Sequence, residues 1–148
     1  MNVIRVLCLD VGEKKIGVAV SDSLGFTAQG LGVINKKNRK DTLFQIGIYL
    51  EKYNVEEILL GLPLNMNGTS GPKVEEVISF KKVLENKFDL PVKTWDERLT
   101  TVTAHKALLE ADVSRSKRKK VVDKLAAVLI LEGYLQASKE KADDDNNT

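Results

Sequence analysis

The chain has 148 residues, of which 43% are hydrophobic, and this length is enough for one domain with a buried core. It contains no continuous apolar run of about 18 residues and no basic-then-apolar leader, so we expect a cytoplasmic protein with no membrane partner. A single cysteine, Cys8, excludes a disulfide framework and suits a reducing compartment. The formal net charge is only +2, because three aspartates at 143–145 offset a more basic body.

The first third of the chain predicts three antiparallel strands and a helix. Apolar runs at residues 3–9 and 16–20 flank a polar turn that contains Gly12, which is the pattern of a β-hairpin. Residues 27–34 form the expected third strand, placed at a sheet edge because two glycines weaken it. Apolar residues then recur at helical spacing from residue 43, so we expect a helix that ends near Asn54.

The middle of the chain alternates strands and helices. Residues 57–61 are almost continuously apolar, as in a parallel strand that is covered on both faces, and residues 90–95 form a further short strand. Pro72 is placed to open one helix, and another is expected at 100–110. Three antiparallel strands followed by two parallel ones predict an α/β fold with a five-stranded mixed sheet flanked by helices.

The last part of the chain predicts one long buried helix and a polar tail. Residues 111–120 are polar and are expected to be loose, whereas 121–135 include seven consecutive apolar residues and predict a helix that is buried nearly all round. The segment 139–148 has too little apolar content to fold. We therefore expect a single domain at 1–138 and a disordered acidic tail at 139–148.

Three acidic residues are candidates for a shared site. Asp10 and Glu97 each fall at the carboxyl end of a strand, at the sheet edge where sites of α/β proteins form. If the strand at 57–61 lies between theirs, their backbones are about 10 Å apart, and Asp123 at the start of the last helix could supply a third ligand. Such oxygen ligands suit Mg²⁺ or Mn²⁺. Taken singly, each acid could equally be a turn, helix-start or surface residue.

A metal site beside basic side chains is typical of phosphodiester chemistry, in which one or two ions activate a water and stabilise the leaving oxygen. The candidate phosphate contacts are basic or amide residues in the hairpin turn, the loop at 62–71, the strand end before residue 99 and the cluster RSKRKK: Lys14, Lys15, Asn65, Asn67, Arg98, Arg115, Lys117, Arg118, Lys119 and Lys120. The cluster could also be a solvated helix start, and the asparagines could merely shape their loop. Trp95 could stack on a base or belong to the core, and His105 is expected to be a packing or surface residue.

Four ordered motifs give the chain a family resemblance. LDVGEKKIGVAVSD at 9–22, GLPLNMNGTSGP at 61–72, DERLTT at 96–101 and VDKLAAVLILEGYL at 122–135 resemble the YqgF (RuvX) family of bacterial proteins, which are described as pre-16S rRNA nucleases and as Holliday junction resolvase-like. The resemblance implies a ribonuclease H-like fold and a metal-dependent nuclease that matures the 5′ end of 16S rRNA. It also implies that Asp10, Glu97 and Asp123 bind the metal.

One departure from the related resolvases keeps other functions open. Those proteins have an acid at the end of the second parallel strand, where this chain has Gly61-Leu62-Pro63, so Glu97 could replace the missing ligand. A resolvase acting on branched DNA shares every candidate residue, and a non-catalytic RNA-binding assembly factor would explain the missing acid. The hairpin opening also resembles the phosphate loop of actin-like ATPases, but a chain of this length has no room for their second domain. Whether the protein is a monomer or a homodimer is left open.

Overall fold

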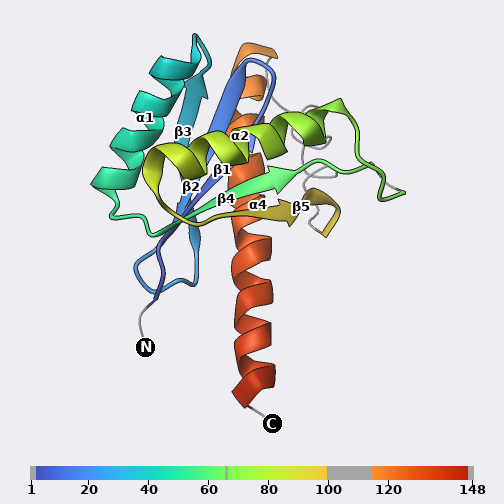
Figure 1. Ribbon diagram of the computed structural model, residues 1–148. Helices are drawn as coiled ribbons and strands as arrows, with labels where there is room; N and C mark the ends of the chain where they lie inside the picture. Colours follow the sequence, from blue (N-terminus) through green and yellow to red (C-terminus); the bar gives the residue numbers. More distant parts are fainter. Residues whose placement is uncertain (1–2, 66, 100–114, 147–148) are drawn as a thin grey trace.

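The fold is built on one five-stranded sheet. The computed structural model describes residues 3–65, 67–99 and 115–146, and it describes side chains outside 115–123 and 142–146. In chain order the strands are β1 (Val6–Val11), β2 (Lys15–Ser21), β3 (Ala28–Asn35), β4 (Glu57–Leu62) and β5 (Val92–Asp96). They are arranged in the order β3-β2-β1-β4-β5 (Figure 1).

The direction of each strand confirms the predicted mixed sheet. β1 and β2 are antiparallel, and so are β2 and β3, which makes β3 an edge strand as expected. β4 is parallel to both β1 and β5 and lies between them. The carboxyl ends of β1, β4 and β5 therefore meet at one edge of the sheet, which is where the sequence places its candidate acids.

Helices cover both faces of the sheet (Figure 1). On one face lie α1 (Arg39–Lys52) and α2 (Pro72–Phe88), whose apolar residues pack with the side chains that point to that face, such as Leu7 and Leu9. On the other face α4 (Arg115–Asn146) packs small and branched residues against Cys8 and Leu59. Alternation along β1 therefore divides its side chains between two cores.

Two helices differ from their expected bounds. α1 starts four residues earlier than the apolar periodicity indicates, because the side chain of Asn38 caps it by accepting a hydrogen bond from the Asp41 amide at 2.8 Å. α4 starts at Arg115 inside the segment predicted to be loose, and it continues to Asn146 through most of the segment predicted to be disordered. Lys, Ala and Leu are frequent in α4 and proline is absent from its sequence, so a helix held by its buried middle can propagate in both directions.

The predicted helix at 100–110 lies outside the described residues, as does His105 within it. A short 3-10 helix, η1 (Glu97–Leu99), follows β5 directly and carries one of the candidate acids. None of the described helices combines the length and the apolar character that crossing a bilayer requires.

Candidate active site

Asp10 lies next to the carboxyl end of the central strand β1, between two glycines on neighbouring strands. On one side it pairs with Gly17 of β2. On the other side Leu9 pairs with Leu60 of β4, so the next residues along these parallel strands, Asp10 and Gly61, are neighbours about 4.8 Å apart. Neither glycine has a side chain, so no Cβ atom on the two neighbouring strands crowds the Asp10 carboxylate.

The side chain of Glu97 occupies the space above Gly61. A Cβ atom built on Gly61 would lie 3.3 Å from both Cγ and Cδ of Glu97 and 2.7 Å from Cδ1 of Ile130 on α4. The glycine therefore allows a carboxylate from the end of β5 to reach back over β4, toward the strand that carries Asp10. Glu97 therefore covers Gly61, at the strand end where this sequence has no acidic residue.

The buried thiol of Cys8 lies near both carboxylates, on the face of the sheet where Glu97 lies beside Ile130 of α4. Burial raises the pKa of Cys8 well above its ordinary value, and the negative charges of Asp10 and then Glu97 raise it further. Cys8 lies two residues before Asp10 and therefore points to the same face, the one covered by α4. The thiol stays protonated and is not a candidate nucleophile or metal ligand.

The third candidate acid belongs to the helix that crosses this face. Ala126, Ala127 and Ile130, which share a helix face with position 123 by spacing, are buried against the sheet. The side chain of Asp123 lies outside the described residues. Within the part of the chain whose side chains are described, no three Asp, Glu, His or Cys residues form a metal-binding group. The carboxylates of Asp10 and Glu97 are nevertheless hard oxygen donors of the kind that Mg²⁺ and Mn²⁺ prefer.

A clamp between Asp96 and Arg98 fixes the backbone on both sides of Glu97. The Arg98 amide donates to Oδ1 of Asp96 at 3.0 Å, and the guanidinium Nε and Nη2 atoms donate to the same carboxylate, Nη2 at 2.7 Å. The Arg98 side chain holds the pKa of Asp96 below its usual value. The sequence patterns did not single out Asp96 as a site residue, although the Asp-x-Arg spacing across a strand end is a signal for such a turn.

The loop after β4 lies beside this clamp and is shaped by its own side chains. The guanidinium Nη1 of Arg98 is 3.3 Å from the Cβ position of Gly68, which has a left-handed φ of 86°. Asn67 accepts hydrogen bonds from the amide and the hydroxyl of Thr69, and Asn65 donates to that hydroxyl at 3.0 Å. Asn65 and Asn67 are exposed, and the hydrogen bonds described for their side chains lie within the loop. They therefore shape the loop that lies beside Arg98.

The remaining predicted phosphate contacts fall into two groups. Lys14 is exposed and Lys15 half-buried at the β1–β2 turn, directly after the strand that carries Asp10. Five others are in the first turns of α4, where the side chains lie outside the described residues: Arg115, Lys117, Arg118, Lys119 and Lys120.

Trp95 packs edge-to-face on Tyr134, with ring centroids 5.9 Å apart, and belongs to the α4-side core.

Comparisons with known proteins identify relatives over almost the whole chain. The family model described as "RuvX: Holliday junction resolvase" matches residues 4–137. A protein of Clostridium beijerinckii named "Putative pre-16S rRNA nuclease" is 54% identical over 137 residues, which cover 93% of this chain and 99% of the relative. A protein of Clostridium kluyveri with the same name is 56% identical over 131 residues, covering 88% of this chain and 96% of the relative.

A solved structure with the same fold is the RuvC protein of Thermus thermophilus in complex with a Holliday junction substrate. It aligns with a TM-score of 0.53 at 15% sequence identity, over 92% of this chain and 97% of that one. At this identity the likeness shows the fold, which is the five-stranded ribonuclease H-like arrangement of the RuvC proteins.

Proposed function

This chain belongs to the RuvX family, and from that premise we propose that it is a divalent-metal-dependent endonuclease that hydrolyses phosphodiester bonds in structured RNA. The proposed substrate is the 5′ end of precursor 16S rRNA, in keeping with the names of its relatives. The observation that carries the proposal is the Glu97 side chain over Gly61, one strand away from Asp10, which supports two carboxylates converging at one sheet edge.

Three acids are proposed to hold the metal: Asp10, Glu97 and Asp123. When bound, Mg²⁺ or Mn²⁺ would supply an activated water and neutralise charge on the reacting phosphate. The protein's own part is to fix two of the carboxylates on rigid elements, Asp10 within the central strand and Glu97 between the two members of the Asp96–Arg98 clamp. Fixed ligands lower the entropy that must be lost when the phosphate binds.

Basic groups around the carboxylates are proposed to bind the phosphate backbone. Lys14 and Lys15 extend from the turn that follows β1, and Arg98 lies against the loop that follows β4. Arg98 already shares its guanidinium with Asp96, so it acts as a positioned cation near the site rather than a long mobile one. Phosphate contacts of this kind give affinity and register but carry no sequence information.

The proposal is tested by cleavage of an end-labelled precursor 16S rRNA fragment with Mn²⁺, with Mg²⁺ and with chelator. We expect metal-dependent cuts whose rate falls more than about 100-fold in Asp10→Asn and in Glu97→Gln, since loss of mere outer-shell partners of a metal already costs about 10- to 100-fold. Glu132→Gln, which removes the charge of an exposed acid on α4, is the matched control and is expected to cleave normally.

A parallel measurement of RNA binding distinguishes a wrong metal-site assignment from a protein that binds RNA without cleaving it. Asp10→Asn is expected to bind the fragment as tightly as the wild type or more so, because a negative charge next to phosphate is removed. Equal cleavage by Asp10→Asn and wild type would overturn the metal-site assignment. Tight RNA binding without cleavage under any metal condition would favour a non-catalytic assembly factor instead.

A DNA junction is the second candidate substrate, because the description of the matching family names a Holliday junction resolvase. A four-way junction is therefore assayed beside the RNA under the same conditions. Faster cleavage of the junction, with symmetric cuts in two strands, would favour the resolvase function.

A further inference from the structure

Two basic segments that are far apart in the sequence meet at the β1–β2 turn. Lys14 and Lys15 belong to the turn, and the connection from β3 to α1 reads Lys36-Lys37-Asn38-Arg39-Lys40. Lys15 pairs with Asn35 across the sheet, the Lys36 amide donates to the Lys14 carbonyl at 2.9 Å, and the Lys36 ammonium donates to the Gly12 carbonyl at 3.0 Å. We call the resulting set of six cations the basic ridge: Lys14, Lys15, Lys36, Lys37, Arg39 and Lys40.

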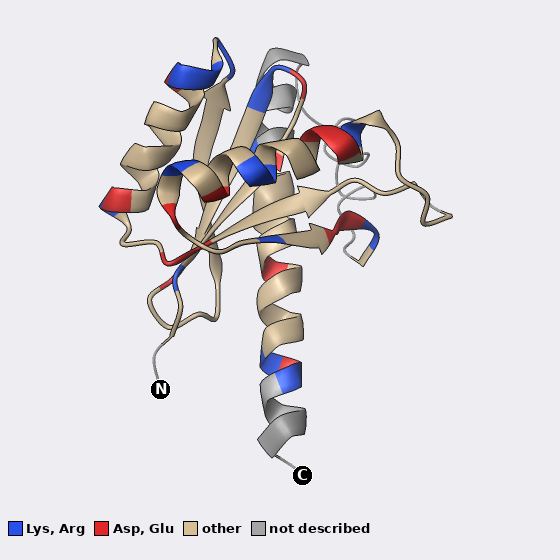
Figure 2. Cartoon of the chain, viewed as in Figure 1, with Lys and Arg blue, Asp and Glu red and all other residues tan. Residues whose placement is uncertain are grey.

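The basic ridge is not explained by ion pairing. In the described part of the chain, none of its six cations forms a salt bridge, and all except the half-buried Lys15 are exposed. Figure 2 shows these basic positions together at the end of the molecule where β1 finishes. Their positive charges are therefore available to a polyanion from outside.

The position of two ridge residues costs the fold stability. Arg39 and Lys40 occupy the first turn of α1, where the positive end of the helix dipole disfavours cations. Asp41 is the acid of that turn, and its carboxylate already accepts a hydrogen bond from Gln45 at 2.7 Å. A negatively charged ligand at the ridge would relieve this repulsion.

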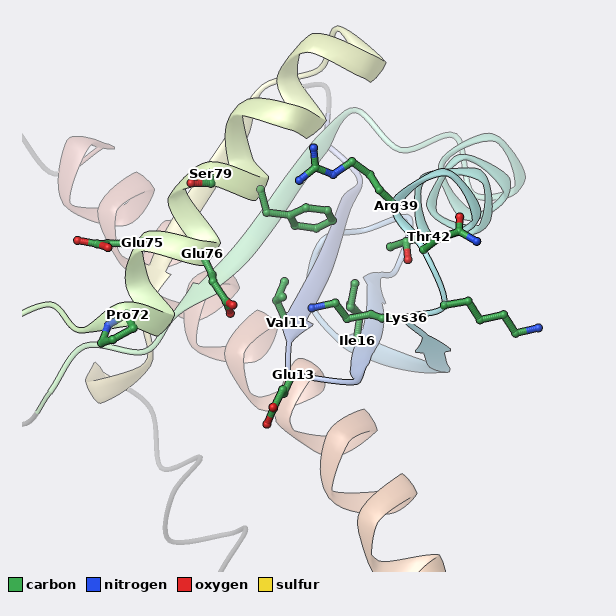
Figure 3. Close-up of a pocket in the computed structure, with 13 residues that line it drawn as sticks. Val11, Glu13, Ile16, Lys36, Arg39, Thr42, Pro72, Glu75, Glu76 and Ser79 are labelled. Atoms are coloured by element: carbon green, nitrogen blue, oxygen red, sulfur yellow. The ribbon is translucent and has the colours of Figure 1, made fainter.

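A cleft next to the basic ridge limits where a negatively charged ligand can bind. The cleft has a volume of about 560 Å³ and separates the ridge from the start of α2. In Figure 3, Lys36 and Arg39 extend from one wall toward α2, from which Glu76 points into the cleft, while Glu13 stands at its edge on the β1–β2 turn. Glu76 and Glu13 repel phosphate from the cleft itself, so a phosphate chain is directed along the exposed cations of the ridge and not across the cleft.

We propose that the basic ridge binds the phosphates of an RNA strand a few nucleotides away from the cleaved bond. The inference rests on the proposed nuclease function, because the cleaved bond is taken to lie at Asp10 and Glu97. The ridge residues at 36–40 follow β3, two strand spacings or about 10 Å from β1, and one strand of a duplex spans that distance in about three nucleotides. The ridge thus extends the phosphate-binding surface from the hairpin turn to α1.

Binding without metal tests the ridge separately from catalysis. The probe is a fluorescent RNA hairpin about two helical turns long, titrated in chelator with Asp10→Asn protein at several salt concentrations. The ridge variant carries Lys37→Gln, Arg39→Gln and Lys40→Gln, and Lys36 is kept because it ties the connection to Gly12. The control variant loses the same charge at exposed lysines away from the ridge, with Lys82→Gln, Lys139→Gln and Lys141→Gln.

The ridge variant is expected to bind the hairpin at least tenfold more weakly. The slope of log K against log salt should fall by about 0.9 for each phosphate that the protein no longer neutralises. Its melting temperature should equal or exceed that of the parent, because cations leave the start of a helix. The control variant should keep its affinity within about twofold, apart from the small effect of net charge.

Three results would overturn the inference: an equal loss of affinity in the two variants, no loss in either, or no binding of the hairpin by the parent protein. Because binding is measured without metal, these results are independent of whether Asp10 supports cleavage. Tighter binding of a four-way DNA junction than of the hairpin, with the same dependence on the ridge, would keep the surface and reassign its partner from RNA to DNA.

Discussion

At the residue scale, the candidate site depends on the absence of a side chain at Gly61. Gly61 stands beside Asp10 on the neighbouring strand, and the space above it is filled by the Glu97 carboxyl group and by Ile130 of α4. The absence of a side chain at position 61 therefore allows a carboxylate from the end of β5 to lie over β4, the strand next to Asp10.

Substitution of Gly61 by alanine is expected to reduce cleavage because it displaces Glu97. The new Cβ would lie 3.3 Å from Glu97 Cγ and Cδ and 2.7 Å from Ile130 Cδ1, so both side chains must move. Overpacking of this size costs about 1 kcal/mol of unfolding free energy. Thermal melting and cleavage by Gly61→Ala measure the two effects.

A second substitution separates packing from positioning. Ile130→Val removes the Cδ1 atom that meets the new Cβ, so Gly61→Ala/Ile130→Val is expected to be less destabilised than the sum of its single variants. Glu97 remains displaced, and cleavage should stay low. If the double variant recovers wild-type cleavage together with its stability, Gly61 acts only through packing and Glu97 is not positioned by it.

At the scale of an element, the short helix η1 holds Glu97 through the residues on its two sides. Asp96 accepts hydrogen bonds from both the amide and the guanidinium of Arg98, so one carboxylate caps the turn and orients the cation. The pKa of Asp96 is lowered by this hydrogen bond to Arg98. A lowered pKa means that the contribution of the clamp to stability is complete above the ordinary Asp value of about 3.9 and is lost as pH falls through the lowered value in the folded protein.

Two substitutions of Asp96 should therefore have graded effects on cleavage. Asp96→Asn keeps an oxygen acceptor for the Arg98 amide and weakens only the charged pair, so we expect a loss of a few-fold. Asp96→Ala removes both hydrogen bonds and is expected to lose about tenfold or more. Rates are compared at neutral pH, and RNA binding serves as a separate readout. Identical rates for the two variants would indicate that the backbone cap does not position Glu97.

The sequence was sufficient to predict the strands and helices, because their periodic patterns involve residues that are close together in the chain. Alternation and apolar runs predicted the five strands and their directions. The position of β4 between β1 and β5, which brings the ends of β1 and β5 to one edge, was only a condition of the site prediction and comes from the structure. The length of α4 was underestimated, because a helix anchored in its middle can continue through residues that would not fold alone.

Contacts between distant side chains could not be read from local patterns. Glu97 covers Gly61 only because β4 and β5 pair in a particular register and α4 brings Ile130 down from above. The basic ridge likewise requires Lys14 and Lys36 to meet across the hairpin, whereas in the sequence the segment 36–40 is an ordinary polar connection. Tertiary placement gives these residues their roles.

At the scale of the whole molecule, α4 joins the proposed active site to a polar anchor at the opposite end of the sheet. Near the start of β4 the buried carboxylate of Glu57 accepts a hydrogen bond from the Tyr134 hydroxyl at 2.8 Å and forms an ion pair with Lys93 at 2.9 Å. The hydrogen bond with Glu57 raises the pKa of Lys93, while burial and then Glu57 raise the pKa of Tyr134. Position 123 lies eleven residues before Tyr134 in the sequence, so α4 extends from the proposed active site to the Glu57 anchor.

Both raised pKa values set the direction of the pH dependence of stability. The contribution of each group is complete below its ordinary pKa, about 10.4 for lysine and 10 for tyrosine, and is lost as pH rises through the raised value in the folded protein. We therefore expect the free energy of unfolding to fall above about pH 10, and to fall less steeply in Tyr134→Phe, which cannot ionise there.

Tyr134→Phe is also expected to separate stability from catalysis. Loss of a hydrogen bond to a buried carboxylate costs about 1.5 kcal/mol at neutral pH, which lowers the melting temperature by roughly 5 °C. The control is Tyr53→Phe, whose hydroxyl makes no hydrogen bond within the described residues, and which should melt like the wild type. Cleavage by Tyr134→Phe well below its melting temperature should be unchanged, because the anchor and the carboxylates are at opposite ends of the parallel strands. Reduced cleavage by a fully folded Tyr134→Phe would mean instead that α4 transmits the geometry of its anchor to Asp123.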